Sequence, residues 1–215
     1  MSKKANLDKH RPAPPNLPTQ FTEDFYLEDE VTFEGIKIED LDYSYLSARN
    51  LMLKGSHLKK ITMQRTRLER VECSNVVFEK CDLSNLDWIG GSFHQVVFDQ
   101  CKLTGTNFAE SYLRDCRFTN CIANFASFSA TNVKNVQFDN CQLNDSEFFE
   151  ATWKHLFLEN NELTNSNWMN TTMSGLDLST NEFERIILSQ DRLRNLTVNQ
   201  EQALTIAAGL GIKIV

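Results

Sequence analysis

The sequence lacks several features that define common functional classes. It has no apolar stretch long enough to span a bilayer, and its basic N-terminus runs into prolines where a secretory signal would be apolar. It has no P-loop, no GxSxG motif and no dinucleotide fingerprint. We therefore expect a cytoplasmic protein of one domain that has no membrane partner and is not an enzyme. We also expect no cofactor and no small-molecule substrate.

What the sequence does contain is a repeated phrase of eight residues. It reads VVFEKCDL (76–83), VVFDQCKL (96–103) and VQFDNCQL (136–143), with starts that are 20 and then 40 residues apart. The segment in place of the missing copy, CRFTNCIA, keeps the Phe and the second Cys at the same positions. The chain therefore repeats with a period of 20 residues.

A shorter period of five residues lies within this repeat. Every fifth residue from Phe33 to Val198 is hydrophobic, in 34 consecutive instances, although only 41% of the chain is hydrophobic. A second column, two residues earlier in each unit, holds small or branched side chains such as Val76, Cys81 and Thr106. Two inward and three outward residues in five match neither a helix nor an ordinary strand. The pattern predicts short bent strands joined by turns, as in the wall of a solenoid.

The 20-residue period sets the number of walls in this solenoid. Four units of five make one coil, so that like residues lie above one another in successive coils. About 8.5 coils at about 4.8 Å each give a rod about 40 Å long. The two apolar columns fill its interior and leave no pore. We predict an all-β fold, a quadrilateral β-helix over residues 31–198.

Individual units of five also carry a family resemblance. They follow an order of small residue, polar residue, Leu or Phe, and two further polar residues, as in CDLSN (81–85), TNFAE (106–110), ASFSA (126–130) and LDLST (176–180). In this order the chain resembles the pentapeptide-repeat family over residues 31–200. The resemblance implies that the quadrilateral β-helix is right-handed.

The N-terminal 30 residues differ from the repeats in composition. Residues 1–20 hold all four prolines and four cations, which predicts an extended basic arm without a packed core. The next ten residues are acidic and aromatic. We expect Phe21, Phe25 or Tyr26 to cover the first coil, because the end of a solenoid exposes both its core and a strand edge.

The C-terminal segment 199–215 predicts a short helix and a terminal strand. Asn199 is the expected N-cap with Gln202 as its capping-box partner, Gly209 or Gly211 ends the helix, and IKIV has the pattern of a strand. The segment resembles the C-terminal helix and tail of Qnr-type and MfpA-type pentapeptide-repeat proteins, which implies a cap, an end-to-end homodimer or both. The expected dimer residues are Leu204, Ile206, Leu210 and Ile212.

Cysteine is sparse, and the six cysteines all fall on the two inward columns. This placement predicts free thiols packed as small apolar residues, without disulfides. A metal site is not expected, because ligands stacked in a line about 4.8 Å apart do not enclose a tetrahedral ion. The four histidines lie in the arm or on outward columns.

Function is therefore expected on the outer walls. The residues after Phe78 and its equivalents form an acidic ladder that Thr119 interrupts, and the next wall carries a basic ladder. The Qnr and MfpA resemblance implies a DNA mimic that binds DNA gyrase or topoisomerase IV. Such a protein either protects the enzyme from fluoroquinolones or inhibits it, and direct DNA binding is not expected. The expected contact residues are Glu79, Asp99, Asp139, Glu147, Glu150 and Glu159.

Two other surface features leave alternatives open. Outward apolar residues form a stripe that suits an interaction scaffold with an unrelated partner. These residues are Ile89, Phe149 and Met169, with Ile122 and Phe125 near the edge. A cluster of cations between residues 54 and 70 is suited to nucleic acid or an acidic partner.

Overall fold

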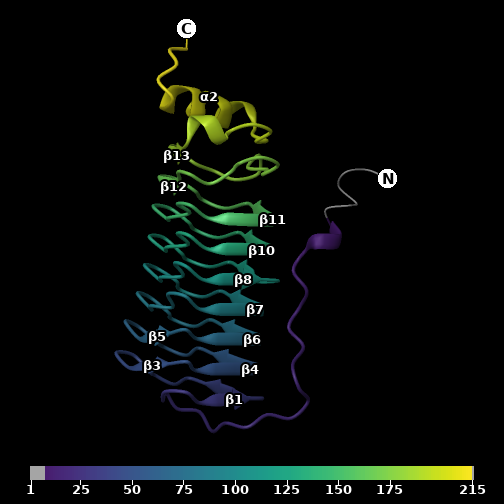
Figure 1. Ribbon diagram of the computed structural model, residues 1–215, viewed down its shortest axis with the longest axis vertical. Helices are drawn as coiled ribbons and strands as arrows, with labels where there is room; N and C mark the ends of the chain where they lie inside the picture. The colour runs from purple at the N-terminus through teal and green to yellow at the C-terminus, as the bar shows by residue number, and fades with distance from the viewer. Residues whose placement is uncertain (1–7, 215) are drawn as a thin grey trace.

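The computed structural model describes residues 8–214, and it shows a rod of stacked coils with a helix at one end (Figure 1). Every strand pair is parallel and joins residues 20 apart, as Phe78 pairs with Phe98. Four units of five residues make each coil. The fold is the predicted right-handed quadrilateral β-helix.

Each coil has four walls, which we number in chain order by their central core residue. Walls 1, 2, 3 and 4 are centred on the columns of Phe93, Phe98, Leu103 and Phe108. Five long strands each cover walls 1 and 2: β4 (Met52–Lys59), β6 (Glu72–Glu79), β7 (Ser92–Asp99), β10 (Asn132–Asp139) and β11 (Thr152–Glu159). The short strands are β1 (Thr32–Glu34), β2 (Lys37–Glu39), β3 (Ser47–Arg49), β5 (Arg67–Glu69), β8 (Tyr112–Arg114), β9 (Arg117–Thr119), β12 (Ser166–Trp168) and β13 (Ile186–Leu188).

The chain turns each corner through a left-handed residue. Every fifth residue from Glu30 to Gly175 has a positive φ, and Asn and Gly are frequent there because they adopt this conformation at low cost. The last coil is less regular. It contains a short 3₁₀ helix, η2 (Gln190–Arg192), and the Asn165 N–H donates to the Arg185 carbonyl, one residue beyond the register of the earlier coils.

Stacked aromatic rings form the centre of the core. On wall 2 the Phe98, Phe118 and Phe138 rings are nearly parallel, with centroids 4.7 and 4.4 Å apart. A second stack on wall 4, opposite, meets them edge-on, as Phe108 meets Phe118 at 5.9 Å. Offset-stacked and edge-on contacts are both favourable for aromatic rings. The repeat therefore stabilises the rod in the same way in each of these coils.

Free thiols occupy positions on the two inward columns. All six cysteines are buried and unpaired, as predicted. The Cys101 thiol, for example, donates a weak hydrogen bond to the Phe78 carbonyl of the coil below, with a sulfur–oxygen distance of 3.3 Å. Burial raises the pKa of Cys116 to about 12 and that of Cys73 further. The thiols of Cys73 and Cys116 are therefore protonated and unreactive at neutral pH.

Both ends of the rod are covered. Phe25 is buried at the first coil, where its ring meets Phe33 edge-on at 4.8 Å. At the other end α2 (Gln200–Gly209) has the predicted capping box between Asn199 and Gln202. The Gln202 side chain is buried, and its Nε2 donates to the Leu178 and Asn181 carbonyls at 2.8 and 2.6 Å. The helix thus supplies donors to the open edge of the last coil.

The predicted terminal strand is wrong for the described part of IKIV. Residues 212–214 have no strand pairing and lie beyond the end of α2. The helix and its cap already occupy the end of the rod, so this segment has no strand edge to join. The last residue of the predicted strand lies outside the described residues.

Candidate functional site: two charged ladders and the arm between them

Two ladders of opposite charge lie side by side on the long strands. On wall 2 Glu79, Asp99, Thr119, Asp139 and Glu159 are aligned in successive coils, as predicted. On wall 1 the aligned residues are His94, Arg114, Lys134 and Lys154. The two ladders are five residues apart along each coil. We call them the acidic ladder and the basic ladder.

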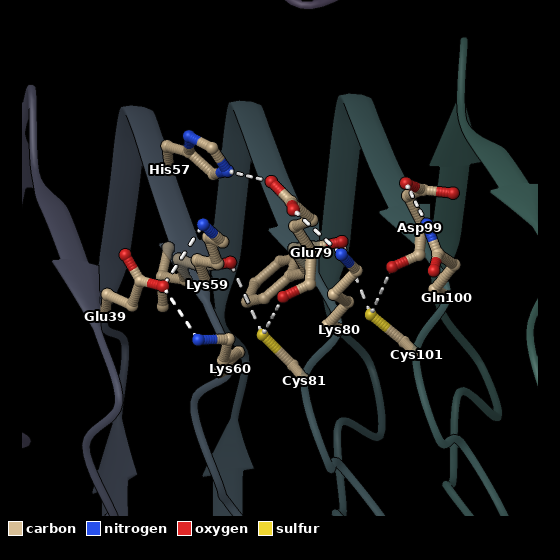
Figure 2. A network of polar contacts seen from close by, with 12 residues as sticks. Glu39, His57, Lys59, Lys60, Glu79, Lys80, Cys81, Asp99, Gln100 and Cys101 are labelled. Carbon is tan, nitrogen blue, oxygen red and sulfur yellow. Dashed lines mark hydrogen bonds and ion pairs between the residues drawn. The ribbon is translucent and has the colours of Figure 1, made fainter.

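The carboxylates of the acidic ladder differ in their partners. Glu79 Oε2 lies 3.1 Å from His57 Nε2, and its other oxygen lies 3.8 Å from Lys80 Nζ (Figure 2). Asp99 accepts a hydrogen bond from Gln100 at 3.2 Å, and Asp139 accepts one from Asn160 at 3.3 Å. Neither aspartate forms an ion pair with the described residues.

The N-terminal end of wall 2 is neutralised by lysines. Lys59 lies directly below Glu79 in the ladder, and Lys59 and Lys60 both reach Glu39 with nitrogen–oxygen distances of 3.1 Å (Figure 2). Hydrogen bonds from Lys60 and then Lys59 lower the pKa of Glu39. Arg67, in the same basic cluster, likewise pairs with Glu69 at 2.9 Å. Much of the basic cluster between residues 54 and 70 is therefore engaged within the rod.

The two remaining predicted contact residues lie elsewhere. Glu147 lies on wall 4, on the opposite side of the rod, and Glu150 lies at the edge of that wall, at its corner with wall 1. Asn167 and Asn170 donate to them at 2.7 and 3.2 Å. The six predicted residues therefore form one ladder of four and a separate pair. No single flat surface contacts all six.

The N-terminal arm lies along the rod between the two ladders. After the 3₁₀ helix η1 (Asp8–His10), the chain descends beside the stack from the level of β11 to below β1 (Figure 1). It follows the corner between walls 1 and 2, which we call the first corner. The corner residues are Gly35, Gly55, Asn75, Gln95, Asp115, Asn135 and His155.

Every second residue of the arm contacts the rod, and each of these residues contacts the next coil along the rod. The Asn16 N–H donates to Asn75 Oδ1 at 2.8 Å, and Gln95 Nε2 donates to the Pro14 carbonyl at 3.1 Å. In the next coil Arg117 Nη2 donates to the carbonyl of the buried Pro12 at 3.4 Å. This alternation fixes the register of the arm on the corner.

Corner glycines make room for the start of the arm. A Cβ at Gly55 would lie 3.1 Å from Pro18 Cδ, and one at Gly35 would lie 3.4 Å from the Gln20 carbonyl oxygen. Both glycines have positive φ, so a larger residue would also be strained. Glycine at these two corners therefore allows the arm to lie close to the backbone of the rod.

The end of the arm is held by an arginine clamp. The Arg11 guanidinium donates to both carboxylate oxygens of Glu159 at 2.6 and 2.7 Å, and it lies 4.8 Å from the centroid of the Phe157 ring. Gln137 Nε2 donates to the same carboxylate at 2.9 Å and helps to orient it. A bidentate pair of this kind is specific for arginine.

A histidine pair lies beside the clamp. The His10 and His155 rings stack with centroids 3.7 Å apart, and Asn135 Oδ1 lies 2.9 Å from His155 Nδ1. Desolvation, and then the charges of His10 and the nearby lysines 154 and 134, lower the pKa of His155. The docked arm therefore favours the neutral form of His155.

The sequence predicted the arm but not its position on the rod. Glu159, expected to contact a partner, instead binds Arg11 of its own chain. The available signals were the prolines of the arm, three of which (Pro12, Pro14 and Pro18) are an even number of residues apart, and the two glycines at equivalent corners. Neither signal identifies Glu159 as the partner of Arg11, because the two residues are 148 positions apart.

The predicted dimer residues lie at the helix end of the rod. Leu204, Leu210 and Ile212 are exposed, whereas Ile206 packs against the core. Three of the four are thus available for a further contact. Ile206 belongs to the cap.

The predicted apolar stripe is also partly exposed. The Phe125 side chain is 62% exposed at a corner with φ of 60°, and Ile122 and Met169 are 39% and 43% exposed. Ile89 and Phe149 are half-buried. A bulky residue rarely adopts a positive φ, so Phe125 is the most unusual member of the stripe.

Residues 8–214 contain no group of three His, Cys, Asp or Glu side chains arranged to hold a metal ion. Within the same residues no helix has the length and apolar character needed to cross a bilayer.

Comparisons with known proteins give a match to one family model and to several solved structures. Residues 91–168 match the family model described as a pentapeptide repeat region. HetL, a pentapeptide repeat protein of the cyanobacterium Nostoc, is 14% identical over 79% of this chain and 87% of its own, with a TM-score of 0.46. A trypsin-treated form of QnrB1, a plasmid-mediated fluoroquinolone resistance protein, is 17% identical over 88% of this chain and 100% of its own, with a TM-score of 0.39.

A pentapeptide repeat protein of the Arabidopsis thaliana thylakoid lumen is 17% identical over 53% of this chain and 66% of its own, with a TM-score of 0.20. The comparison with curated proteins gives no match. The left-handed corners continue without a break on both sides of the matched residues, from Glu30 to Gly175. Residues 91–168 thus match a pentapeptide repeat region, and the five-residue corners of that region extend beyond it in both directions.

Proposed function

We propose that the protein is a non-catalytic DNA mimic that binds DNA gyrase or topoisomerase IV in the cytoplasm. The observation that supports this proposal is the acidic ladder, which aligns four carboxylates along one wall of a straight rod. Successive coils are about 4.8 Å apart, so the ladder forms a line of negative charge. A topoisomerase that binds duplex DNA offers a complementary basic surface.

The rod resembles DNA in charge only at selected positions. An end-to-end dimer would be about 80 Å long, and duplex DNA of that length carries roughly 47 negative charges. Two chains at −7 each give −14. Asp99 and Asp139, which form no ion pair with described residues, are therefore the proposed centre of the contact. Glu79 and Glu159 flank this centre.

The dimer in this proposal forms through the helix end of the rod. Leu204, Leu210 and Ile212 expose apolar surface beyond the cap. Burial of this surface against a second copy would place the two rods end to end and continue the acidic ladder in the partner. The resemblance of the tail to those of Qnr-type and MfpA-type proteins supports the same arrangement.

The activity is tested by DNA supercoiling with purified gyrase, titrated with the protein in the presence and absence of a fluoroquinolone. Rescue of supercoiling from the drug indicates protection of the enzyme and would account for fluoroquinolone resistance. Inhibition without rescue indicates a decoy for DNA. No effect in either reaction contradicts the proposed function.

Charge reversal tests the surface. The double variant Asp99→Lys and Asp139→Lys is expected to lose gyrase binding, because it replaces attraction with repulsion at the centre of the contact. The matched control is Glu147→Lys and Glu150→Lys, which makes the same change in net charge on wall 4. Equal binding by the two double variants would show that the acidic ladder is not the contact surface.

An interaction scaffold is the second candidate, and the exposed stripe around Phe125 supports it. A scaffold that uses this stripe would keep its partner after reversal of Asp99 and Asp139. It would lose the partner on Phe125→Asp, which removes an exposed ring that is 62% accessible. Affinity capture with these two variants distinguishes the candidates.

A further inference from the structure

The N-terminal arm is attached to the rod in a way that suits exchange. In residues 8–20 it forms no strand with the coils, and most of its residues from 13 to 20 are exposed. Backbone pairing begins only at Thr22, which bridges to Ile36. The arm is thus bound by a short series of side-chain contacts at regular intervals.

The geometry of the first corner matches an extended peptide. Pro18, Asn16, Pro14 and Pro12 contact four successive coils, two arm residues to a coil. Two residues of a polyproline segment advance about 6 Å, while coils are about 4.8 Å apart, so the peptide keeps this register without being fully stretched. The prolines also restrict the free peptide to extended conformations, which lowers the entropy lost on binding.

Specificity resides at the end of the corner. The Arg11 guanidinium is gripped by both oxygens of Glu159 and lies over the Phe157 ring, and Gln137 orients the carboxylate. A lysine would reproduce neither the bidentate pair nor the planar stacking. The site therefore selects an arginine that precedes a proline-containing extended segment.

One contact under the arm is incomplete. Arg117 Nε is buried without a hydrogen-bond partner, although Nη2 of the same side chain reaches Pro12. A buried donor without an acceptor is costly, and this one belongs to a side chain that contacts the arm.

We propose that the first corner is a binding site for an extended, proline-spaced peptide with an arginine, occupied here by residues 10–20, and that such a segment on a partner protein enters by displacing the arm. This site recognises a basic peptide and does not depend on the proposed contact with a topoisomerase. The arm acts as an intramolecular competitor that raises the partner concentration needed for binding.

The test uses the full chain and a fluorescent synthetic peptide, DKHRPAPPNLPTQ, which has the sequence of residues 8–20. In the variant Arg11→Glu the arm is repelled by Glu159 and exposes the site. Fluorescence anisotropy is expected to show at least about tenfold tighter peptide binding to this variant than to the unaltered protein. Lys9→Glu, with the same charge change two residues away, is the matched control and is expected to bind as the unaltered protein does.

Two further peptides test recognition. A peptide with glutamate in place of its arginine is expected not to bind Arg11→Glu, and to bind the single variant Glu159→Arg, in which Arg11 of the arm is repelled and the site is exposed. A peptide of scrambled order is expected to bind at least about tenfold more weakly than the natural order. Equal binding of natural and scrambled peptides, or equal peptide binding by Arg11→Glu and Lys9→Glu, would overturn the proposal.

Discussion

At each corner of a coil one residue adopts the left-handed conformation. The side chain of that residue determines how much conformational strain the corner carries. Asn and Gly meet this requirement with little strain, whereas Phe125 and Ala130 do not. The five-residue period in the sequence therefore reflects two demands at once. One position must be apolar and inward, and another, two residues later, must tolerate a positive φ.

Phe125 allows this conformational cost to be measured. The variant Phe125→Gly is expected to be more stable than Phe125→Ala by about 1 kcal/mol, because both lack the ring but only alanine keeps a Cβ at φ of 60°. Chemical denaturation gives the two free energies of unfolding. The same pair of substitutions at Lys102, which lies outside a corner in a β-bridge, is expected to show the opposite order. The same order at both sites would contradict this account of the corners.

The stacked rings give a second prediction at the residue scale. Phe118 lies between Phe98 and Phe138 and is fully buried, so Phe118→Ala is expected to lower the free energy of unfolding by about 3–5 kcal/mol. Tyr112→Ala, which alters a ring that is 62% exposed, is expected to change it by less than about 0.5 kcal/mol. Urea denaturation followed by circular dichroism measures both. Similar costs would show that the stack is not a major source of stability.

Among the elements, α2 contributes chiefly through one side chain. Gln202→Ala leaves the Asn181 carbonyl without its donor, removes one of the donors to the Leu178 carbonyl, and removes half of the capping box. We expect a loss of about 1–3 kcal/mol in the free energy of unfolding. The exposed neighbour Glu201→Ala is the control, and equal losses for the two variants would refute the role of Gln202 as an edge cap.

Docking of the arm is expected to weaken in acid. The pKa of His155 is lowered from 6.5 when the arm is docked, so the docked state binds fewer protons than the released state. Docking is therefore fully favourable above pH 6.5 and loses free energy as the pH falls below that value. The backbone amide resonance of Asn16, which donates to Asn75, reports docking by NMR. His155→Asn should remove most of this dependence, and an unchanged pH profile would contradict the prediction.

The elements differ in how far their sequences predict them. The coils repeat the same inward and outward positions, so one local pattern, read many times, was enough to predict walls, register and core. The arm has no repeated sequence pattern. Its position on the rod depends on single contacts, such as that of Arg11 with Glu159. The IKIV segment has the alternation of a strand, but an apolar pattern does not supply a neighbouring strand edge. The capping box was predictable because its two residues are only three positions apart.

At the scale of the whole molecule, the arrangement of walls decides which charges act together. The period of 20 residues places Glu79, Asp99, Asp139 and Glu159 in one line. It assigns Glu147 to the opposite wall and Glu150 to the edge of that wall. The arm then covers the corner beside this line and engages its last member. The proposed partner surface is therefore narrower than the acidic composition of the chain suggests.

The central claim is that the acidic ladder competes with DNA for a topoisomerase. The most direct test measures displacement of a fluorescent DNA duplex from gyrase by the full-length protein, using anisotropy. We expect complete displacement by the unaltered protein and by the wall 4 variant Glu147→Lys and Glu150→Lys. The variant Asp99→Lys and Asp139→Lys is expected to need at least about tenfold more protein. Failure of the unaltered protein to displace the duplex, or equal displacement by the two variants, would contradict the claim.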